Sequence, residues 1–202
     1  MDMTFGGPGR GNPQQQPLPQ HLPQTPLPPP PLTQPGWGAI PAVLGVVLAA
    51  IGLFALDWSR SMSFADISDA MSSYTGGDTQ LNGQGQWVKS YIKQGVFIAL
   101  VAAAAISCLW TLGTLRTAKG VKQRGGVMKK SLAEGRTMPT RILLSVLTGL
   151  CFVYHLVSVL IMTDNGKDLG DLGPGPWLLL LGAALIAIGT AIGPRVVKLP
   201  GR

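Results

Sequence analysis

The chain has 202 residues, of which 46% are apolar and 12% are charged, and its mean hydropathy is +0.30. Soluble domains carry roughly 25% charged residues, so this composition excludes an ordinary soluble protein and indicates an integral membrane protein. The net charge of +7 does not indicate a nucleic-acid partner, because the basic residues lie between and after apolar segments, where the positive-inside rule explains them.

The first 36 residues are rich in Pro, Gln and Gly and hold too few apolar side chains to bury a core. We expect residues 1–36 to form a disordered Pro/Gln-rich tail. They do not resemble a signal peptide, which places its basic start directly before a short apolar run. The run from Pro28 to Pro31 favours polyproline II, so a polyproline-binding partner is one hypothesis, and a plain flexible tail is the other.

Four apolar segments follow, each close to the 20 or so residues that a helix needs to cross a bilayer. The predicted crossings are residues 37–56, 95–115, 141–162 and 176–193. Small residues on the first crossing give a face that another helix can approach closely: Gly38, Gly45, Ala49 and Gly52. A second such face is expected on the fourth crossing, at Gly182, Gly189 and Gly193. The predicted fold class is all-α, a four-helix transmembrane bundle.

A polar loop, residues 57–94, joins the first two crossings. Ser63 and Asp66 have the spacing of a capping box, and apolar residues follow at three- and four-residue steps. We therefore expect a short amphipathic helix over 63–74. Trp87 and Tyr91 keep the helical phase of the second crossing, so that helix can begin as early as Trp87.

The distribution of charge predicts the orientation. Residues 116–141 carry eight Lys or Arg against one Glu, whereas loops 57–94 and 163–175 are acidic in balance. The positive-inside rule then places the basic loop and both termini in the cytoplasm of a multi-pass plasma-membrane protein. The expected organisation is a cytoplasmic tail at 1–36, a membrane domain at 37–194 and a short basic cytoplasmic tail at 195–202.

The basic loop is also a candidate contact for anionic lipids. A Lys or Arg beside a charged leaflet contributes on the order of 1 kcal/mol, so eight would bind measurably even after screening by salt. The loop can equally be a solvated connection, and the two hypotheses are compatible. The candidate lipid contacts are Arg116, Lys119, Lys122, Arg124, Lys129, Lys130, Arg136 and Arg141.

The third crossing contains His155, which is the one ionisable side chain expected at membrane depth. Small and polar residues three or four positions apart share one helix face with it. Because lipid cannot satisfy hydroxyl or imidazole groups, we expect this polar stripe to face other helices. The stripe consists of Ser145, Thr148, Cys151, His155 and Ser158.

Two interpretations of His155 compete. One is a proton-linked or metal-linked site. The other is a neutral imidazole bonded to Ser158, to a hydroxyl of another helix or to a backbone carbonyl. Apart from Arg141 at the first position of the third, the four predicted crossings contain no Asp, Glu, Lys or Arg, which removes the usual charge partner of a proton relay and favours the second interpretation. A metal site can be drawn from Cys108, Cys151 and His155, but buried Cys more often packs as a small apolar residue. We therefore predict no cofactor.

The motifs of catalysis are also missing from the sequence. It has no GxSxG nucleophile elbow, no CxxC pair and no cluster of aspartates, and His155 has no acidic partner in the membrane. The prediction is therefore a protein that is not an enzyme.

Several stretches together resemble a diffuse group of small four-helix membrane proteins of actinobacteria. They are the Pro/Gln-rich amino terminus, the Ala/Gly/Val-rich first crossing with its LDWS exit, the loop at residues 57–94 and the final GPGPWLLLLGAALIAIGTAIG helix. The resemblance implies the fold and carries over no functional residue. The outer-loop W-GLW-C-C pattern of claudin-like tetraspans is absent.

The predicted function is a non-enzymatic plasma-membrane protein, a partner or scaffold subunit of an envelope-associated complex. Its contact surfaces would be the first outer loop and the Pro-rich tail, facing other membrane or envelope proteins. The alternative is a small oligomeric transporter or channel subunit with His155 lining the path. The lack of intramembrane charge favours the first hypothesis.

Overall fold

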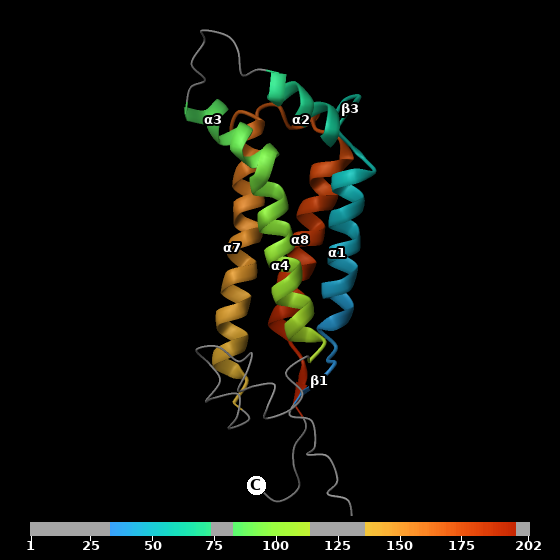
Figure 1. The fold of residues 1–202 in the computed structure, drawn as a ribbon, viewed down its shortest axis with the longest axis vertical. Helices are drawn as coiled ribbons and strands as arrows, with labels where there is room; N and C mark the ends of the chain where they lie inside the picture. The colour runs from blue at the N-terminus through green and yellow to red at the C-terminus, as the bar shows by residue number, and fades with distance from the viewer. Residues whose placement is uncertain (1–32, 74–82, 114–135, 197–202) are drawn as a thin grey trace, which may run out of the picture.

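The computed structural model describes residues 33–73, 83–113 and 136–196, and helices account for 77% of them. The main helical segments run side by side along the long axis, and successive ones point in opposite directions (Figure 1). They are α1 (Ala39–Phe54); α3 (Gly83–Ser90), continued by the π-helical turn η1 (Tyr91–Gly95) and α4 (Val96–Thr111); α7 (Met138–Met162); and α8 (Pro174–Ile192). Of the predicted tail at 1–36, residues 1–32 lie outside the described residues, as do residues 114–135, which hold most of the predicted basic loop. Residues 33–36 of that tail are described and include a short strand, Thr33–Gln34.

Among the described residues, three helices are long and apolar enough to cross a membrane: Gly83–Thr111, Met138–Met162 and Pro174–Ile192. The chain is therefore a helical membrane protein. Helix α1 is equally apolar but has 16 residues, about 24 Å at 1.5 Å per residue, against a hydrocarbon core of about 30 Å. The helices begin and end within a few residues of the predicted segments, except that the second begins at Gly83, twelve residues before the predicted Gly95.

Helices α1 and α8 pack backbone against backbone through glycines. Three pairs lie seven residues apart on each helix: Gly38 with Gly189, Gly45 with Gly182, and Gly52 with Gly175. A Cβ on Gly45 would lie 2.5 Å from the carbonyl oxygen of Gly182 and 2.8 Å from the nitrogen of Ile186, closer than real Cβ atoms come. A seven-residue repeat keeps one face turned toward an antiparallel partner over several turns.

The predicted small-residue faces are present on both helices. Ala49, fully buried, lies between the glycines of α1, and a Cβ on Gly182 would stand 2.8 Å from the Ala49 Cβ. Gly193 follows α8 with a positive φ of 70°, which glycine adopts without steric cost, and it also adjoins Gly38. The tightest contact in the bundle thus joins its first and last long helices.

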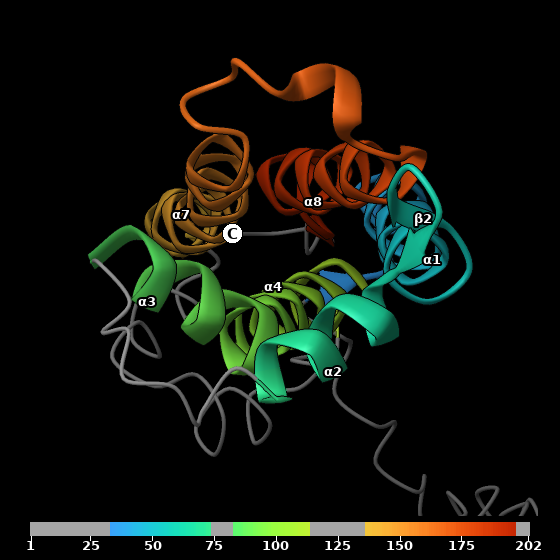
Figure 2. The ribbon, with the colours of Figure 1, turned by 90° about the horizontal axis from the view of Figure 1, so that it is seen from above.

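A folded cap covers one end of the bundle. It consists of the β2–β3 hairpin (Asp57–Ser59 and Met62–Ser63), α2 (Phe64–Ser73) and the short 3₁₀ helix η3 (Leu169–Asp171). Figure 2 shows α2 lying across the ends of the helices near α4, with the hairpin near α1. The indole of Trp58 is fully buried and donates to the Gly52 carbonyl at 2.9 Å. Phe64 packs edge-on against Trp58 at 4.8 Å between ring centroids and against Phe97 at 5.5 Å.

Helix α2 confirms the amphipathic helix predicted within the first loop. The Asp66 carboxylate accepts from the Ser63 hydroxyl at 2.7 Å and from the Ser63 backbone N–H at 2.9 Å. The Asp66 N–H donates to the Ser63 hydroxyl at 3.3 Å, which completes the capping box. These bonds to Ser63, the one from its hydroxyl first, lower the pKa of the Asp66 carboxyl.

At the opposite end of the bundle, two short strands pair antiparallel. β1 (Thr33–Gln34) aligns Thr33 with Val196 and Gln34 with Arg195 of β4 (Arg195–Val196). The Gly36 N–H donates to the Thr111 carbonyl at 3.1 Å and so joins this strand pair to the end of α4. The all-α prediction missed these strands and the cap hairpin, because two- and three-residue strands leave no periodic pattern in a sequence.

Candidate functional site

The predicted polar stripe of α7 faces the neighbouring helices. Thr148, His155 and Ser158 are buried, while Ser145 and Cys151 are half-buried. The Thr148 hydroxyl donates to the Leu144 carbonyl at 3.0 Å, one turn back on the same helix. The stripe does not form one site: His155 and Ser158, nearer the cap, contact α3 and η1, and Ser145 belongs to the other end of the helix, beside Arg141.

His155 is paired with a hydroxyl of another helix. Its imidazole has no exposed surface, and its Nδ1 lies 3.1 Å from the hydroxyl oxygen of Tyr91, which is also fully buried. Of the three hydrogen-bond partners considered for a structural histidine, the hydroxyl of another helix is thus the one found. Ser158, the partner on the same helix, bonds elsewhere.

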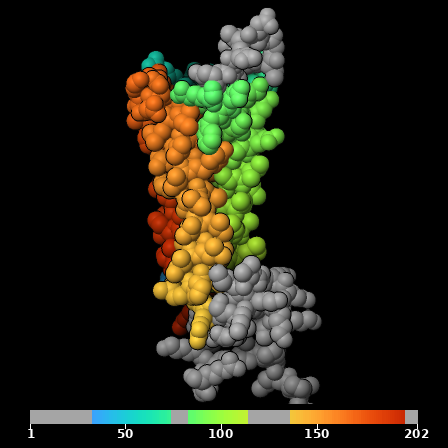
Figure 3. All heavy atoms as spheres, turned by 90° about the vertical axis from the view of Figure 1, so that its left-hand side faces the viewer, coloured from blue at the N-terminus to red at the C-terminus, as the bar shows by residue number. Residues whose placement is uncertain are grey.

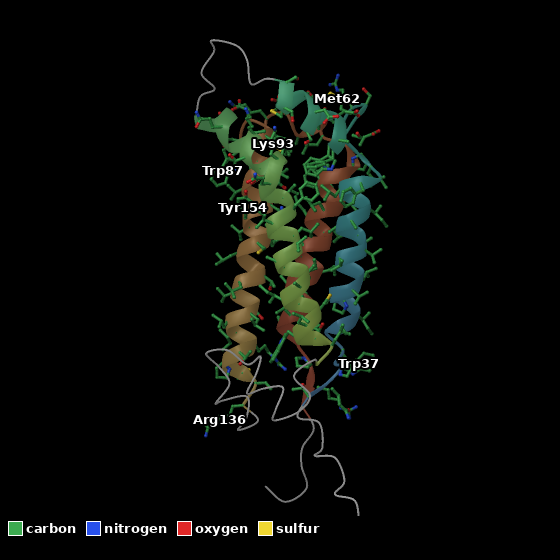
Figure 4. All side chains as sticks on the ribbon, in the orientation of Figure 1. Trp37, Met62, Trp87, Lys93, Arg136 and Tyr154 are labelled. Atoms are coloured by element: carbon green, nitrogen blue, oxygen red, sulfur yellow. The ribbon has the colours of Figure 1, made fainter. Side chains whose placement is uncertain are left out.

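Aromatic side chains close this site from the side of α3. The Trp87 indole N–H donates to the Ser158 hydroxyl at 3.2 Å, and that hydroxyl donates to the Tyr154 carbonyl at 2.8 Å. The ring of Tyr154 lies 5.8 Å from Trp87 and 5.6 Å from Tyr91 between centroids. Figure 4 shows Trp87 and Tyr154 close together where α3 and α7 approach. We call Trp87, Tyr91, Tyr154, His155 and Ser158 the aromatic–histidine cluster.

The π-helical turn η1 shapes this cluster. A π turn adds one residue to a helical turn and shifts the helical phase of the residues after it, and such turns are frequent at functional sites. Here two consecutive residues, Tyr91 and Ile92, are both fully buried. A Cβ on Gly95 would overlap the Tyr154 hydroxyl, so glycine at this position makes the space that Tyr154 occupies.

The imidazole of His155 is satisfied on one side. Its Nε2 is buried and has no hydrogen-bond partner among the described residues. If Nδ1 accepts from Tyr91, the ring hydrogen is on Nε2 and requires an acceptor; if Nδ1 donates, Nε2 requires a donor. In either tautomer the cluster leaves one polar atom open inside the bundle, a position where a water or a small polar group could bind.

The described residues do not form a set of ligands for a metal ion. Among them, no three His, Cys, Asp or Glu side chains lie close enough to hold one. Cys108 and Cys151 are free, half-buried thiols. The three-ligand site drawn from Cys108, Cys151 and His155 is therefore not assembled.

The predicted lipid contacts divide by position. Arg136 lies exposed two residues before α7, and Figure 4 shows it directed away from the bundle. Arg141 is half-buried between α7 and α8. The other six lie outside the described residues: Arg116, Lys119, Lys122, Arg124, Lys129 and Lys130.

Comparison with known proteins finds no matching family model, curated protein or solved structure. The function must therefore be proposed from the positions and contacts of this chain's own side chains. Sequence reasoning identifies His155 and Ser158 but not the partners that Trp87, Tyr91 and Tyr154 provide. The i, i+4 spacing of Trp87 and Tyr91, in phase with the second crossing, is the available indication that both face the third.

Proposed function

We propose that the protein crosses the plasma membrane four times, with α1 as the additional crossing and both termini in the cytoplasm. Helix α1 lies along α8 from Gly38 to Gly52, opposite the stretch from Gly175 to Gly189. Because α8 is itself long enough to span, a partner aligned with it over this length lies at the same membrane depth. Trp37, 79% exposed just before α1, suits an interfacial anchor.

The charges of the described residues support this orientation. All of their acidic side chains lie in the cap, its connections or the turn after α7: Asp57, Asp66, Asp69, Asp164, Asp168 and Asp171. The opposite end carries basic residues alone among the described ones: Arg136, Arg141 and Arg195. The positive-inside rule assigns that end to the cytoplasm and the cap to the outside.

Cysteine labelling of intact cells tests the orientation. In a background with Cys108 and Cys151 replaced, a Ser73→Cys reporter in α2 should react with a membrane-impermeant maleimide. A Ser131→Cys reporter in the basic loop should react only after the cells are permeabilised. The opposite pattern of labelling would reject the proposed topology.

The proposed role is that of a non-enzymatic partner or scaffold subunit in an envelope-associated complex. The observation that carries this proposal is the folded cap. The connection between Phe54 and Gly83 contains secondary structure of its own, the β2–β3 hairpin and α2, and is anchored by the fully buried Trp58. The anchored cap presents Met62, 41% exposed, on a surface that another protein can contact.

Capture of partners in mild detergent followed by mass spectrometry tests this role. The wild type should retain a reproducible membrane or envelope protein, and Met62→Asp in the cap should release it without lowering the melting temperature. Gln34→Asp is the matched control, because it adds the same charge to an exposed strand residue at the other end of the bundle. Capture that fails in the wild type, or that is equally sensitive to both variants, contradicts the proposal.

A second function, a transporter or channel subunit with His155 on its path, has one specific observation in its favour. The His155 Nε2 is an open polar atom deep in the bundle. The absence of exposed surface on His155 favours the scaffold role. Proton flux in reconstituted vesicles separates the two: pH-dependent flux in the wild type that disappears in a stable His155→Gln variant would establish transport, because an amide does not exchange a proton near neutral pH.

A further inference from the structure

A groove runs between α7 and α8 at the basic end of the bundle. It is open to the outside, has a volume of about 480 Å³ and is lined by Met138, Arg141, Ile142, Ser145, Val146 and Ala191. Figure 3 shows α7 running down the face nearest the viewer with α8 beside it. Ile142 is 60% exposed and Val146 is 52% exposed, so the groove has apolar walls. Its polar groups are the side chains of Arg141 and Ser145.

The guanidinium of Arg141 is half-buried and has no carboxylate partner among the described residues. It lies beside the end of α8, where a Cβ on Gly193 would stand 3.2 Å from Arg141 Nε. The carbonyl end of a helix carries a partial negative charge and favours a cation there. Nevertheless Arg141 Nε is buried without a hydrogen-bond partner, and no carboxylate pairs with this side chain among the described residues.

The hydroxyl of Ser145 is a second buried polar atom without a partner among the described residues. It lies one turn from Arg141, about 6 Å along the helix. Other hydroxyls of α7 bond to the carbonyl one turn back: Thr148 to Leu144 at 3.0 Å and Ser158 to Tyr154 at 2.8 Å. The groove thus contains two unpartnered donors one helical turn apart, and the hydroxyl of Thr140, next to Arg141, is a third buried polar group without a partner among the described residues.

We propose that this groove binds one anionic phospholipid. The phosphate would pair with Arg141, whose planar guanidinium suits two-pronged binding to phosphate oxygens. The Ser145 hydroxyl would donate to a glycerol ester carbonyl, and an acyl chain would lie along Ile142, Val146 and Ala191. The apolar walls favour a phospholipid over free phosphate, since phosphate alone leaves them uncovered. This inference is independent of the proposed partner role; it takes Arg141 alone from the predicted lipid contacts and gives it a defined site.

Lipid titration of the purified full-length protein in mild detergent tests the site. Apparent affinity is followed by thermal shift and by native mass spectrometry with phosphatidylglycerol, with phosphatidylcholine of the same acyl chains, and with inorganic phosphate. We expect phosphatidylglycerol to stabilise the wild type and to bind on the order of tenfold to hundredfold more weakly to Arg141→Gln, the loss of one charge-assisted pair. Ser145→Ala should weaken binding by a smaller factor.

Arg136→Gln is the matched control, because it removes the same charge at the same end of the bundle, two residues before α7 and outside the groove. Its affinity for phosphatidylglycerol should equal that of the wild type. Arg141→Lys, which keeps the charge without the planar fork, gives an intermediate affinity and covers the case in which the Gln variant fails to fold. Equal losses in the Arg136 and Arg141 variants, equal binding of phosphatidylcholine, or stabilisation by inorganic phosphate alone would each overturn the proposal.

Discussion

The contact between α1 and α8 and the contact of α7 with α3 and η1 hold helices together in opposite ways. In the first, glycines bring the backbones together, and the spacing leaves no space for a Cβ at Gly45 or Gly182. In the second, large rings fill the space, and hydrogen bonds join Tyr91 to His155 and Trp87 to Ser158. Both are recognised means of association in membranes, where helices gain no hydrophobic free energy by leaving lipid.

The two interfaces differ in how well they tolerate amino-acid substitutions. Backbone contact depends on the absence of side-chain atoms, so any added atom separates the helices along several turns. The aromatic–histidine cluster depends on particular polar atoms, and a substitution there removes one bond while the rings still fill the space. We therefore expect substitutions in the α1–α8 contact to destabilise the bundle strongly. Substitutions in the contact of α7 with α3 and η1 should change its stability in smaller steps.

The largest effect is expected from Gly45→Val. The added side chain would collide with the Gly182 carbonyl and with Ile186. Overpacking of this kind costs typically up to about 3 kcal/mol and occasionally more. Steric trapping in bicelles measures the unfolding free energy directly.

Gly149→Val is the matched control for this change, because a Cβ on Gly149, in the apolar part of α7, meets nothing within 4 Å. It should change the unfolding free energy far less than Gly45→Val. If both valine variants lose the same amount, the effect comes from helix propensity and not from the α1–α8 contact.

An intermediate effect is expected at His155. Leucine leaves the Tyr91 hydroxyl without its partner, whereas glutamine retains a donor and an acceptor. His155→Leu should lose about 1–2 kcal/mol and His155→Gln less, in line with polar contacts between membrane helices. The melting temperatures of the two variants in one detergent rank them, and a Leu variant as stable as the Gln variant would mean that the bond contributes nothing.

A smaller effect isolates the bond itself. Tyr91→Phe removes the hydroxyl and keeps the ring contacts with Tyr154 and His155. A double-mutant cycle of Tyr91→Phe with His155→Leu should give a coupling of about 0.6 kcal/mol, the average for such bonds in membranes. A coupling near zero would assign the stability of this contact to ring packing alone.

The smallest effect on the whole fold is expected in the cap. The Asp66 carboxyl should titrate below the usual 3.9 or so for aspartate, because Ser63 donates to its ionised form. The bonds therefore stabilise the start of α2 above that usual pKa, and this contribution is lost as the pH falls through the lowered value. NMR titration of wild type and Ser63→Ala measures it: the Asp66 pKa should rise in the variant while the melting temperature at neutral pH stays nearly constant.

The sequence predicted the helices well because each apolar run is bounded by Pro, Gly or charge. It also predicted α2, since Ser63 and Asp66 have capping spacing, and the small-residue face of α1. It did not pair α1 with α8. The partner glycines lie seven residues apart at Gly175, Gly182 and Gly189. In a glycine-rich apolar helix, a seven-residue spacing does not by itself indicate which helix is the partner.

The site was predicted in outline and missed in detail. His155 and Ser158 could be identified because polar residues are rare in an apolar helix. The π turn at Tyr91–Gly95 could not be identified, because one inserted residue leaves the hydropathy of the run unchanged. Without that turn, the residues of the second helix that face α7 cannot be identified. The sequence alone therefore does not distinguish Tyr91 from other possible partners of His155.

The pairing of α1 with α8 has a consequence for the order in which the protein assembles. The stretch from Gly38 to Gly52 contacts the stretch from Gly175 to Gly189. The closest contact of the bundle therefore joins residues that are far apart in the sequence. Contacts of such separation form late, because the intervening chain must be ordered first. During synthesis the glycine face of α1 therefore lacks its partner until α8 is made, and a chain released before residue 174 would hold α1 without that partner.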